Sequence, residues 1–197
     1  MHIAILGWGS LIWDPRNLEI DKSEGRTGWF DDGPMLPIEF ARISNDERLT
    51  LVIVPGNKDV QTLYAISKFN ELDHAILDMA IREGCAKSKI GSYVKADRKF
   101  KSIFTDIQTN IEYWINSKEE IEAVIWTDLP ENFQKKVKLP LTKENTINYL
   151  IQLLPHKQSL AEQYIRRAPA IVKTTIRETI EQKFGWFHII IKSKETD

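Results

Sequence analysis

The chain has 197 residues, of which 42% are hydrophobic and 28% are charged, and its formal net charge at pH 7 is −1. This length suffices for one domain with a substantial apolar core, so we expect a single domain over residues 1–197. The near-neutral charge argues against nucleic acid and anionic membrane surfaces as partners, because both select a clearly basic face. The sequence has no apolar run of membrane-spanning length, no signal peptide pattern and one cysteine, which together predict a cytoplasmic protein.

Six short segments rich in β-branched or aromatic residues are predicted to be strands. In chain order they are residues 2–6, 36–43, 49–54, 61–66, 122–126 and 186–191. Turn-forming residues at 45–47 predict a hairpin between the second and third segments. Those at 55–57 predict another hairpin between the third and fourth.

Four helices are predicted, each between a capping residue and a glycine or proline that stops it. Their start and stop signals are Asn70 and Gly84, Thr142 and Pro155, Ser159 and Pro169, and Thr175 and Gly185. In the last two helices the cap is part of a capping box, with Glu162 and Glu178 as the acidic partners. Residues 100–115 fit a helix and a strand equally well. With strands early and helices late, the pattern indicates an α+β domain on a mostly antiparallel or mixed sheet.

The end of the first predicted strand is a candidate ligand loop. The apolar run passes into Gly7, Trp8, Gly9, Ser10 and Leu11. Glycines one residue apart let backbone N–H groups converge on a carboxylate or phosphate without a positive side chain. The spacing matches neither the dinucleotide-binding fingerprint nor the P-loop. A tight turn without a ligand is the alternative.

Glu83 is the candidate catalytic residue. The apolar side chains of the helix predicted after Asn70 form one stripe, and at about 100° per residue Glu83 returns to the angle of Leu72 while Arg82 falls outside the stripe. An apolar surround and a helix C-terminus both disfavour an ionised carboxylate. Such a group can take and return a proton near neutral pH. Fraying of the helix, an outward side chain, or pairing with an arginine are the alternatives.

Cys85 is a weaker candidate, as the nucleophile of a thiol-dependent amidase. The partial negative charge at a helix C-terminus destabilises a thiolate, and no histidine can be assigned to activate the thiol. The four histidines are scattered and show no metal-ligand spacing. We therefore expect neither a metal nor another cofactor.

Together, the loop and the glutamate resemble the gamma-glutamylcyclotransferase-like superfamily. Its hallmark is a Tyr-Gly-Ser-Leu or Tyr-Gly-Ser-Asn loop directly after the first strand, and here Trp8 stands in the place of the tyrosine. The branch that acts on glutathione continues with Ile-Trp, as at Ile12 and Trp13. The family also has a site tyrosine late in the chain, which Tyr164 matches more weakly. The resemblance covers mainly the first half of the sequence.

The resemblance implies a small mixed β-barrel with flanking helices. It implies that the 7–11 loop and Tyr164 bind the substrate, with the Gly9–Leu11 segment on the glutamyl α-carboxylate, and that Glu83 is the general acid/base. In the implied reaction the α-amine of a γ-glutamyl amine or peptide attacks its own γ-carbonyl, closing 5-oxoproline and expelling an amine without a cofactor. A non-catalytic module that binds a carboxylate or a partner on the same barrel is the alternative. The leaving amine and the oligomeric state are not predicted.

Overall fold

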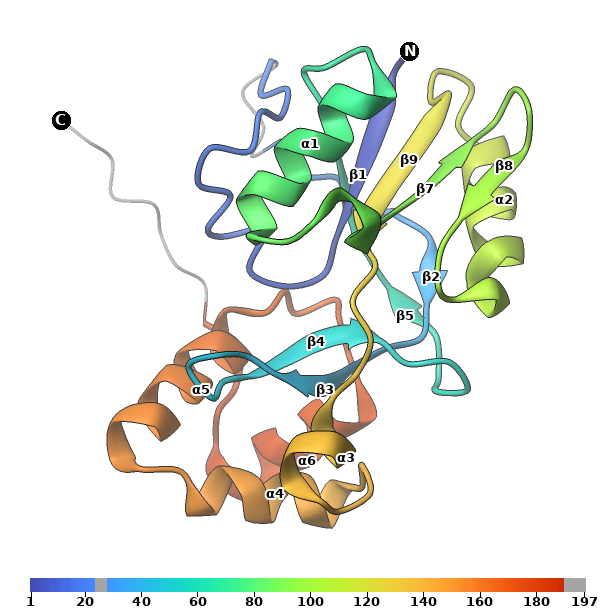
Figure 1. The fold of residues 1–197 in the computed structure, drawn as a ribbon. Coiled ribbons are helices and arrows are strands. Elements are labelled where there is room, and N and C mark those ends of the chain that lie inside the picture. The colour runs from blue at the N-terminus through green and yellow to red at the C-terminus, as the bar shows by residue number, and fades with distance from the viewer. Residues whose placement is uncertain (24–27, 190–197) are drawn as a thin grey trace, which may run out of the picture.

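The computed structural model describes residues 1–23 and 28–189 (Figure 1). It has two parts in space, and the first of them is built on a five-stranded mixed sheet. The strand order is β6 (Leu63–Ile66), β1 (Ile3–Gly7), β9 (Ala123–Thr127), β7 (Ile90–Val94) and β8 (Lys99–Lys101). β1 runs parallel to β9, and the other neighbouring pairs are antiparallel. The α+β class and the mixed sheet predicted from the sequence are confirmed.

Helices cover both faces of this sheet. Because successive strand residues point to opposite faces, Ile3 and Ile5 pack with the apolar stripe of α1 (Leu72–Glu83). Ala4 and Leu6 belong to the larger core on the other face, which also holds the apolar side of α2 (Gln108–Asn116). All five residues of β1 are therefore buried, which explains its uninterrupted apolar sequence.

The second part of the molecule in space is built around an antiparallel hairpin of β3 (Ile38–Ile43) and β4 (Leu49–Ile53). In the described residues four helices lie beside it: α3 (Phe133–Val137), α4 (Lys143–Gln152), α5 (Pro155–Arg167) and α6 (Thr175–Phe184) (Figure 1). α5 packs on β4 and α6 packs on β3. A two-stranded ladder of β2 (Met35–Leu36) and β5 (Val60–Gln61) links the hairpin to the sheet. The two parts share one core.

Two predicted strands are each divided in the structure. Pro37 separates β2 from β3, because proline has no N–H to continue a ladder. Thr62 separates β5 from β6, which pair with different partners. The hairpin predicted at 45–47 is confirmed, whereas that at 55–57 is wrong, because β4 pairs only with β3.

Some of the predicted helix ends are confirmed and others are displaced or wrong. Thr142 caps α4 as predicted, and Gly84 and Gly185 adopt the left-handed conformation that ends α1 and α6. The Ser159 capping box is wrong, because Pro155 begins α5 one turn earlier and places Ser159 inside it. The other predicted starts are displaced by one residue, since the caps of α1 and α6 are Glu71 and Thr174. The capping box of Thr175 and Glu178 is therefore wrong, because the Thr174 side chain accepts from the N–H of Arg177 instead.

Several elements had no counterpart in the sequence prediction. They are β7, β8, α3 and two short 3-10 segments, Lys87–Lys89 and Thr105–Ile107. The ambiguous segment at 100–115 contains the end of β8 and most of α2. Residues 186–189 do not form the predicted strand, and the rest of that segment lies outside the described residues.

Within the described residues the strands form no closed barrel. The edge strands β6 and β8 lie at opposite ends of the five-stranded sheet, while the β3–β4 and β2–β5 pairs are separate sheets. The small barrel implied by the resemblance is therefore not seen, because the hairpin packs across from the open sheet instead of continuing it. No helix in the described part of the chain is both long and apolar enough to cross a membrane.

Candidate functional site

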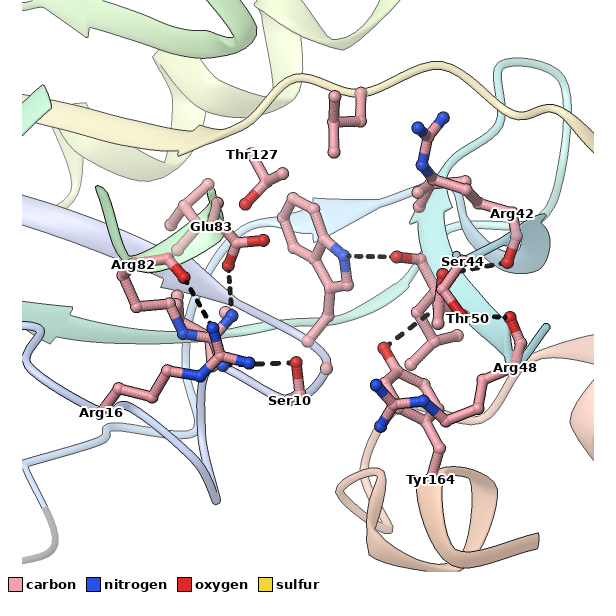
Figure 2. Close-up of a pocket in the computed structure, with 18 residues that line it drawn as sticks. Ser10, Arg16, Arg42, Ser44, Arg48, Thr50, Arg82, Glu83, Thr127 and Tyr164 are labelled. Atoms are coloured by element: carbon pink, nitrogen blue, oxygen red, sulfur yellow. Dashed lines mark hydrogen bonds and ion pairs between the residues drawn. The ribbon is translucent and has the colours of Figure 1, made fainter. Parts of the chain in front are cut away.

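A cavity of about 230 Å³ lies where the two parts of the molecule meet (Figure 2). Its walls come from the end of β1, the β3–β4 hairpin, the end of α1, the segment after β9, and α5. All the site residues predicted from the sequence line it, namely Gly7, Trp8, Gly9, Ser10, Leu11, Glu83 and Tyr164. Cys85 does not line this cavity. The fold thus brings three distant segments of the chain together at one place.

The loop after β1 is a series of tight turns. The amide of Ile12 donates to the carbonyl of Gly9 at 3.1 Å, and that of Asp14 donates to the carbonyl of Ser10 at 2.8 Å. Among the described residues, the N–H groups of Gly9 and Leu11 donate to no protein acceptor. These donors are therefore free to bind an anion in the cavity.

The two loop glycines are required by close packing. Neither Gly7 nor Gly9 has a positive φ, so a left-handed backbone conformation is not the reason for a glycine at either position. A Cβ on Gly9 would lie 2.5 Å from the hydroxyl oxygen of Tyr164, and a Cβ on Gly7 would lie 2.5 Å from Cζ3 of Trp29. The loop therefore approaches α5 more closely than any residue with a side chain would allow.

Glu83 is the last residue of α1, and its carboxylate is held by an arginine. Its side chain is 18% exposed, and Oε1 accepts a hydrogen bond from Nη1 of Arg82 at 2.5 Å. The expectation of an unpaired, fully buried carboxylate is therefore wrong, and pairing with an arginine is the alternative that the structure supports.

Arg82 is the buried partner, contrary to the helical periodicity. Its side chain is only 4% exposed, because its long stem turns back from the helix toward the glycine loop. Nη2 donates to the carbonyl of Asp14 at 2.6 Å. It also donates to Oγ of Ser10 at 3.3 Å (Figure 2). Arg16 in turn donates to the carbonyl of Arg82 at 3.3 Å. One guanidinium thus joins the candidate catalytic carboxylate to the candidate anion-binding loop.

Tyr164 forms the wall contributed by α5. It is 7% exposed, and its hydroxyl accepts hydrogen bonds from the backbone N–H groups of Leu51, at 3.4 Å, and Ser10. Burial raises the pKa of Tyr164 to about 12. The hydroxyl therefore stays protonated at physiological pH and keeps a hydrogen that it can donate into the cavity.

Cys85 is poorly suited to nucleophilic chemistry. Its thiol is half-buried against the core beneath α1, and both burial and the nearby Glu83 charge raise its pKa. Both effects reduce the thiolate fraction, which is the reactive form. In the described residues, no group of three or more His, Cys, Asp or Glu side chains is placed to hold a metal ion.

The sequence prediction missed the arginines of the cavity. Arg16, Arg42, Arg48 and Arg82 all line it. The one available signal was that Arg42 and Arg48 bracket the predicted turn at 45–47, which places both at the same end of a hairpin. Among the described residues that line the cavity, Glu83 is the single carboxylate, so these side chains favour anionic ligands.

No protein-family model, curated protein or solved structure matches this chain.

Proposed function

We propose that this protein is a cyclotransferase that releases 5-oxoproline from a γ-glutamyl amine or peptide, with Glu83 as the general acid/base. The observation that carries the proposal is that one small cavity is lined by Glu83, by the free amides of the glycine loop and by the protonated hydroxyl of Tyr164. These groups meet three needs of the reaction, which are proton transfer, carboxylate binding and carbonyl polarisation.

The glycine loop is suited to the α-carboxylate of the substrate. The amides of Gly9 and Leu11 have no other acceptor among the described residues, and the hydroxyl of Ser10 lies beside them. The guanidinium of Arg82, 3.3 Å from that hydroxyl, adds positive charge at the same wall. A carboxylate bound here would place the adjoining α-amine toward Glu83.

Glu83 is suited to moving one proton in both directions. Arg82 occupies Oε1, and no described residue donates to Oε2, which remains available to the substrate. In the proposed step the carboxylate takes a proton from the α-ammonium group, and the freed amine attacks the γ-carbonyl carbon. The new C–N bond closes the five-membered ring, the old C–N bond breaks, and the leaving nitrogen receives the proton back from Glu83. The ring nitrogen gives up its second proton as the ring amide forms, and the departing amine takes up this proton. The substrate is thus converted to 5-oxoproline and an ammonium ion with no change in oxidation state.

Tyr164 is suited to the developing negative charge on the γ-carbonyl oxygen. Its raised pKa keeps the hydroxyl a donor, and the backbone bonds from Leu51 and Ser10 hold the oxygen in place. A donor fixed before the reaction begins stabilises an oxyanion without reorganisation.

The proposal includes membership of the gamma-glutamylcyclotransferase-like superfamily. The support for this membership comes from the site residues and not from the fold. In the described residues the sheet is open at its edge strands β6 and β8, so it does not form the barrel of that superfamily. A binding module without turnover is the competing function. In such a module Glu83 would serve only to pair with the buried Arg82, so the effect of Glu83→Gln on turnover distinguishes the two functions.

The test measures 5-oxoproline released from a panel of γ-glutamyl amino acids, γ-glutamyl amines and glutathione. Glu83→Gln should retain substrate binding and lose at least ~100-fold in turnover, because the amide cannot carry the proton. Glu144→Gln, at an exposed position of α4, is the matched control and should keep full turnover. Release of 5-oxoproline from no member of the panel, or full turnover by Glu83→Gln, would overturn the proposal.

A further inference from the structure

The wall of the cavity opposite Glu83 carries charge that the proposed mechanism does not use. This hairpin wall consists of Arg42, Ser44, Arg48 and Thr50 of β3, β4 and the turn between them. Figure 2 shows these residues across the cavity from Arg82 and Glu83.

Arg42 has no carboxylate partner among the described residues. The other three arginines of the cavity each lie within ion-pair distance of one, since Arg82 binds Glu83, Arg16 binds Asp14 and Arg48 binds Asp46. Arg42 instead donates from Nη1 to the carbonyl of Pro130 at 2.6 Å. Burial lowers the pKa of its guanidinium.

Arg48 also keeps an unused donor. Its Nη2 lies 2.7 Å from the Asp46 carboxylate, and the guanidinium lies over the ring of Tyr164, 5.8 Å from the centroid. Its Nε is buried and has no hydrogen-bond partner in the part of the chain that the structure describes. Buried N–H groups are almost always paired in folded proteins, so an unpaired one beside a cavity indicates a place for an acceptor.

We propose that the hairpin wall is a second anion subsite, which binds a carboxylate or phosphate on the leaving part of the substrate through Arg42 and Arg48. The inference rests on the proposed function, because the glycine loop on the other wall then holds the α-carboxylate. The ligand carries an anionic group at each end, with the reacting carbonyl between them. A neutral leaving amine would leave Arg42 without a carboxylate partner and Nε of Arg48 without an acceptor, and a cationic one would be repelled.

The test compares three ligands that share the γ-glutamyl part and differ in the charge and the anionic group of the leaving part. They are γ-glutamylalanine, its neutral alaninamide counterpart, and γ-glutamyl-phosphoethanolamine, and calorimetry on Glu83→Gln measures their binding without turnover. The two anionic ligands should bind at least ~10-fold more tightly than the amide, because hydrogen bonds to charged groups are strong when partly buried. The tighter of the two identifies the anion as a carboxylate or a phosphate.

Substitutions on the hairpin test whether Arg42 and Arg48 cause the tighter binding of the anionic ligands. Arg42→Gln and Arg48→Gln should each weaken the anionic ligands and leave the affinity for the amide unchanged. Arg42→Lys, which keeps the charge, should retain part of the preference. Arg167→Gln, at an exposed arginine of α5 outside the cavity, is the control and should retain all of it. Equal affinity for the amide and the anionic ligands, or an equal loss of all three in the hairpin variants, would overturn the subsite.

The subsite can fail separately from the proposed function. If no γ-glutamyl ligand binds, the proposed function fails, and inorganic phosphate then tests the hairpin wall alone. Phosphate binding that Arg42→Gln and Arg48→Gln weaken, and that Arg167→Gln does not, would support the subsite. Phosphate binding that none of these variants alters, or no phosphate binding at all, would overturn it.

Discussion

The contact between Gly9 and Tyr164 can be tested by adding one methyl group. In Gly9→Ala the new Cβ would lie 2.5 Å from the hydroxyl oxygen of Tyr164 and 3.6 Å from its Cζ. Gly9 does not have a positive φ, so alanine meets no backbone strain there. The effect of the substitution therefore isolates the close approach of the loop to α5.

The size of the effect follows from what holds the tyrosine. An ordinary contact needs roughly 1 Å more than the 2.5 Å available, so the hydroxyl or the loop must move. The ring is packed edge-on against Trp13 and Phe40, with centroid distances of 5.2 and 6.3 Å, and it has little freedom to retreat. Overpacking of this kind costs about 1–3 kcal/mol, and the lower entropy of the unfolded alanine chain offsets part of it. We expect the free energy of unfolding to fall by about 1–2 kcal/mol.

A double-mutant cycle separates this clash from other effects of the alanine. In the Tyr164→Phe background the clashing oxygen is gone, and the next atom is at 3.6 Å, which is ordinary van der Waals contact. Gly9→Ala should therefore cost almost nothing in that background, giving a coupling energy of about 1–2 kcal/mol in urea denaturation. An equal loss of stability in both backgrounds would show that Gly9 and Tyr164 are not in contact.

Three further predictions concern ionisable side chains. Arg82→Gln should lower the free energy of unfolding by about 3 kcal/mol, because it removes one partner of a largely buried ion pair. The control Arg167→Gln, at an exposed position, should not change the free energy of unfolding. An unchanged urea midpoint for Arg82→Gln would contradict this prediction. Tyr149 and Tyr164 each have a pKa of about 12, so their phenolate absorbance should appear well above the range of an unfolded tyrosine, and ionisation complete near pH 10 would contradict this. Because the folded pKa is the higher one, the stability that these tyrosines contribute is fully present below about pH 10 and is lost as the pH rises toward 12. Cys85→Ser should leave 5-oxoproline release unchanged, and the thiol should react slowly with iodoacetamide because burial raises its pKa; loss of release would restore Cys85 as a candidate nucleophile.

The features that could be predicted from the sequence are those set by neighbouring residues. The buried run of β1, the cap of α4 at Thr142 and the left-handed stops at Gly84 and Gly185 depend on local backbone chemistry, and the structure contains all of them. β7 was missed because Gly91 and Ser92 weaken its strand pattern. In the structure the glycine is needed there, since a Cβ would lie 2.4 Å from the ring of Trp126.

The features that could not be predicted depend on side chains that reach across the fold. Helical periodicity places a Cβ, and it predicts Glu83 on the apolar stripe of α1, whereas in the structure Glu83 is partly exposed and lines the cavity. The same argument put Arg82 outside, because it ignores the long stem that carries the guanidinium back to Ser10. Arg42 and Arg48 were missed because only the packing of the hairpin against the β1 loop makes them part of a cavity.

The dimensions of that cavity are set by one backbone unit of β4. The N–H of Leu51 donates to the hydroxyl of Tyr164 at 3.4 Å, and its carbonyl accepts from the indole Nε1 of Trp8 at 3.3 Å. β4 pairs with β3 along one edge only. The bonds to Tyr164 and Trp8 therefore provide partners for the N–H and C=O of Leu51 on the other edge of β4, where they would otherwise be buried without hydrogen bonds. The glycine loop and α5 are thereby both fixed relative to the hairpin that carries Arg42 and Arg48. Because the proposed anion subsite lies on that hairpin, we expect the cavity to select ligands by length as well as by charge.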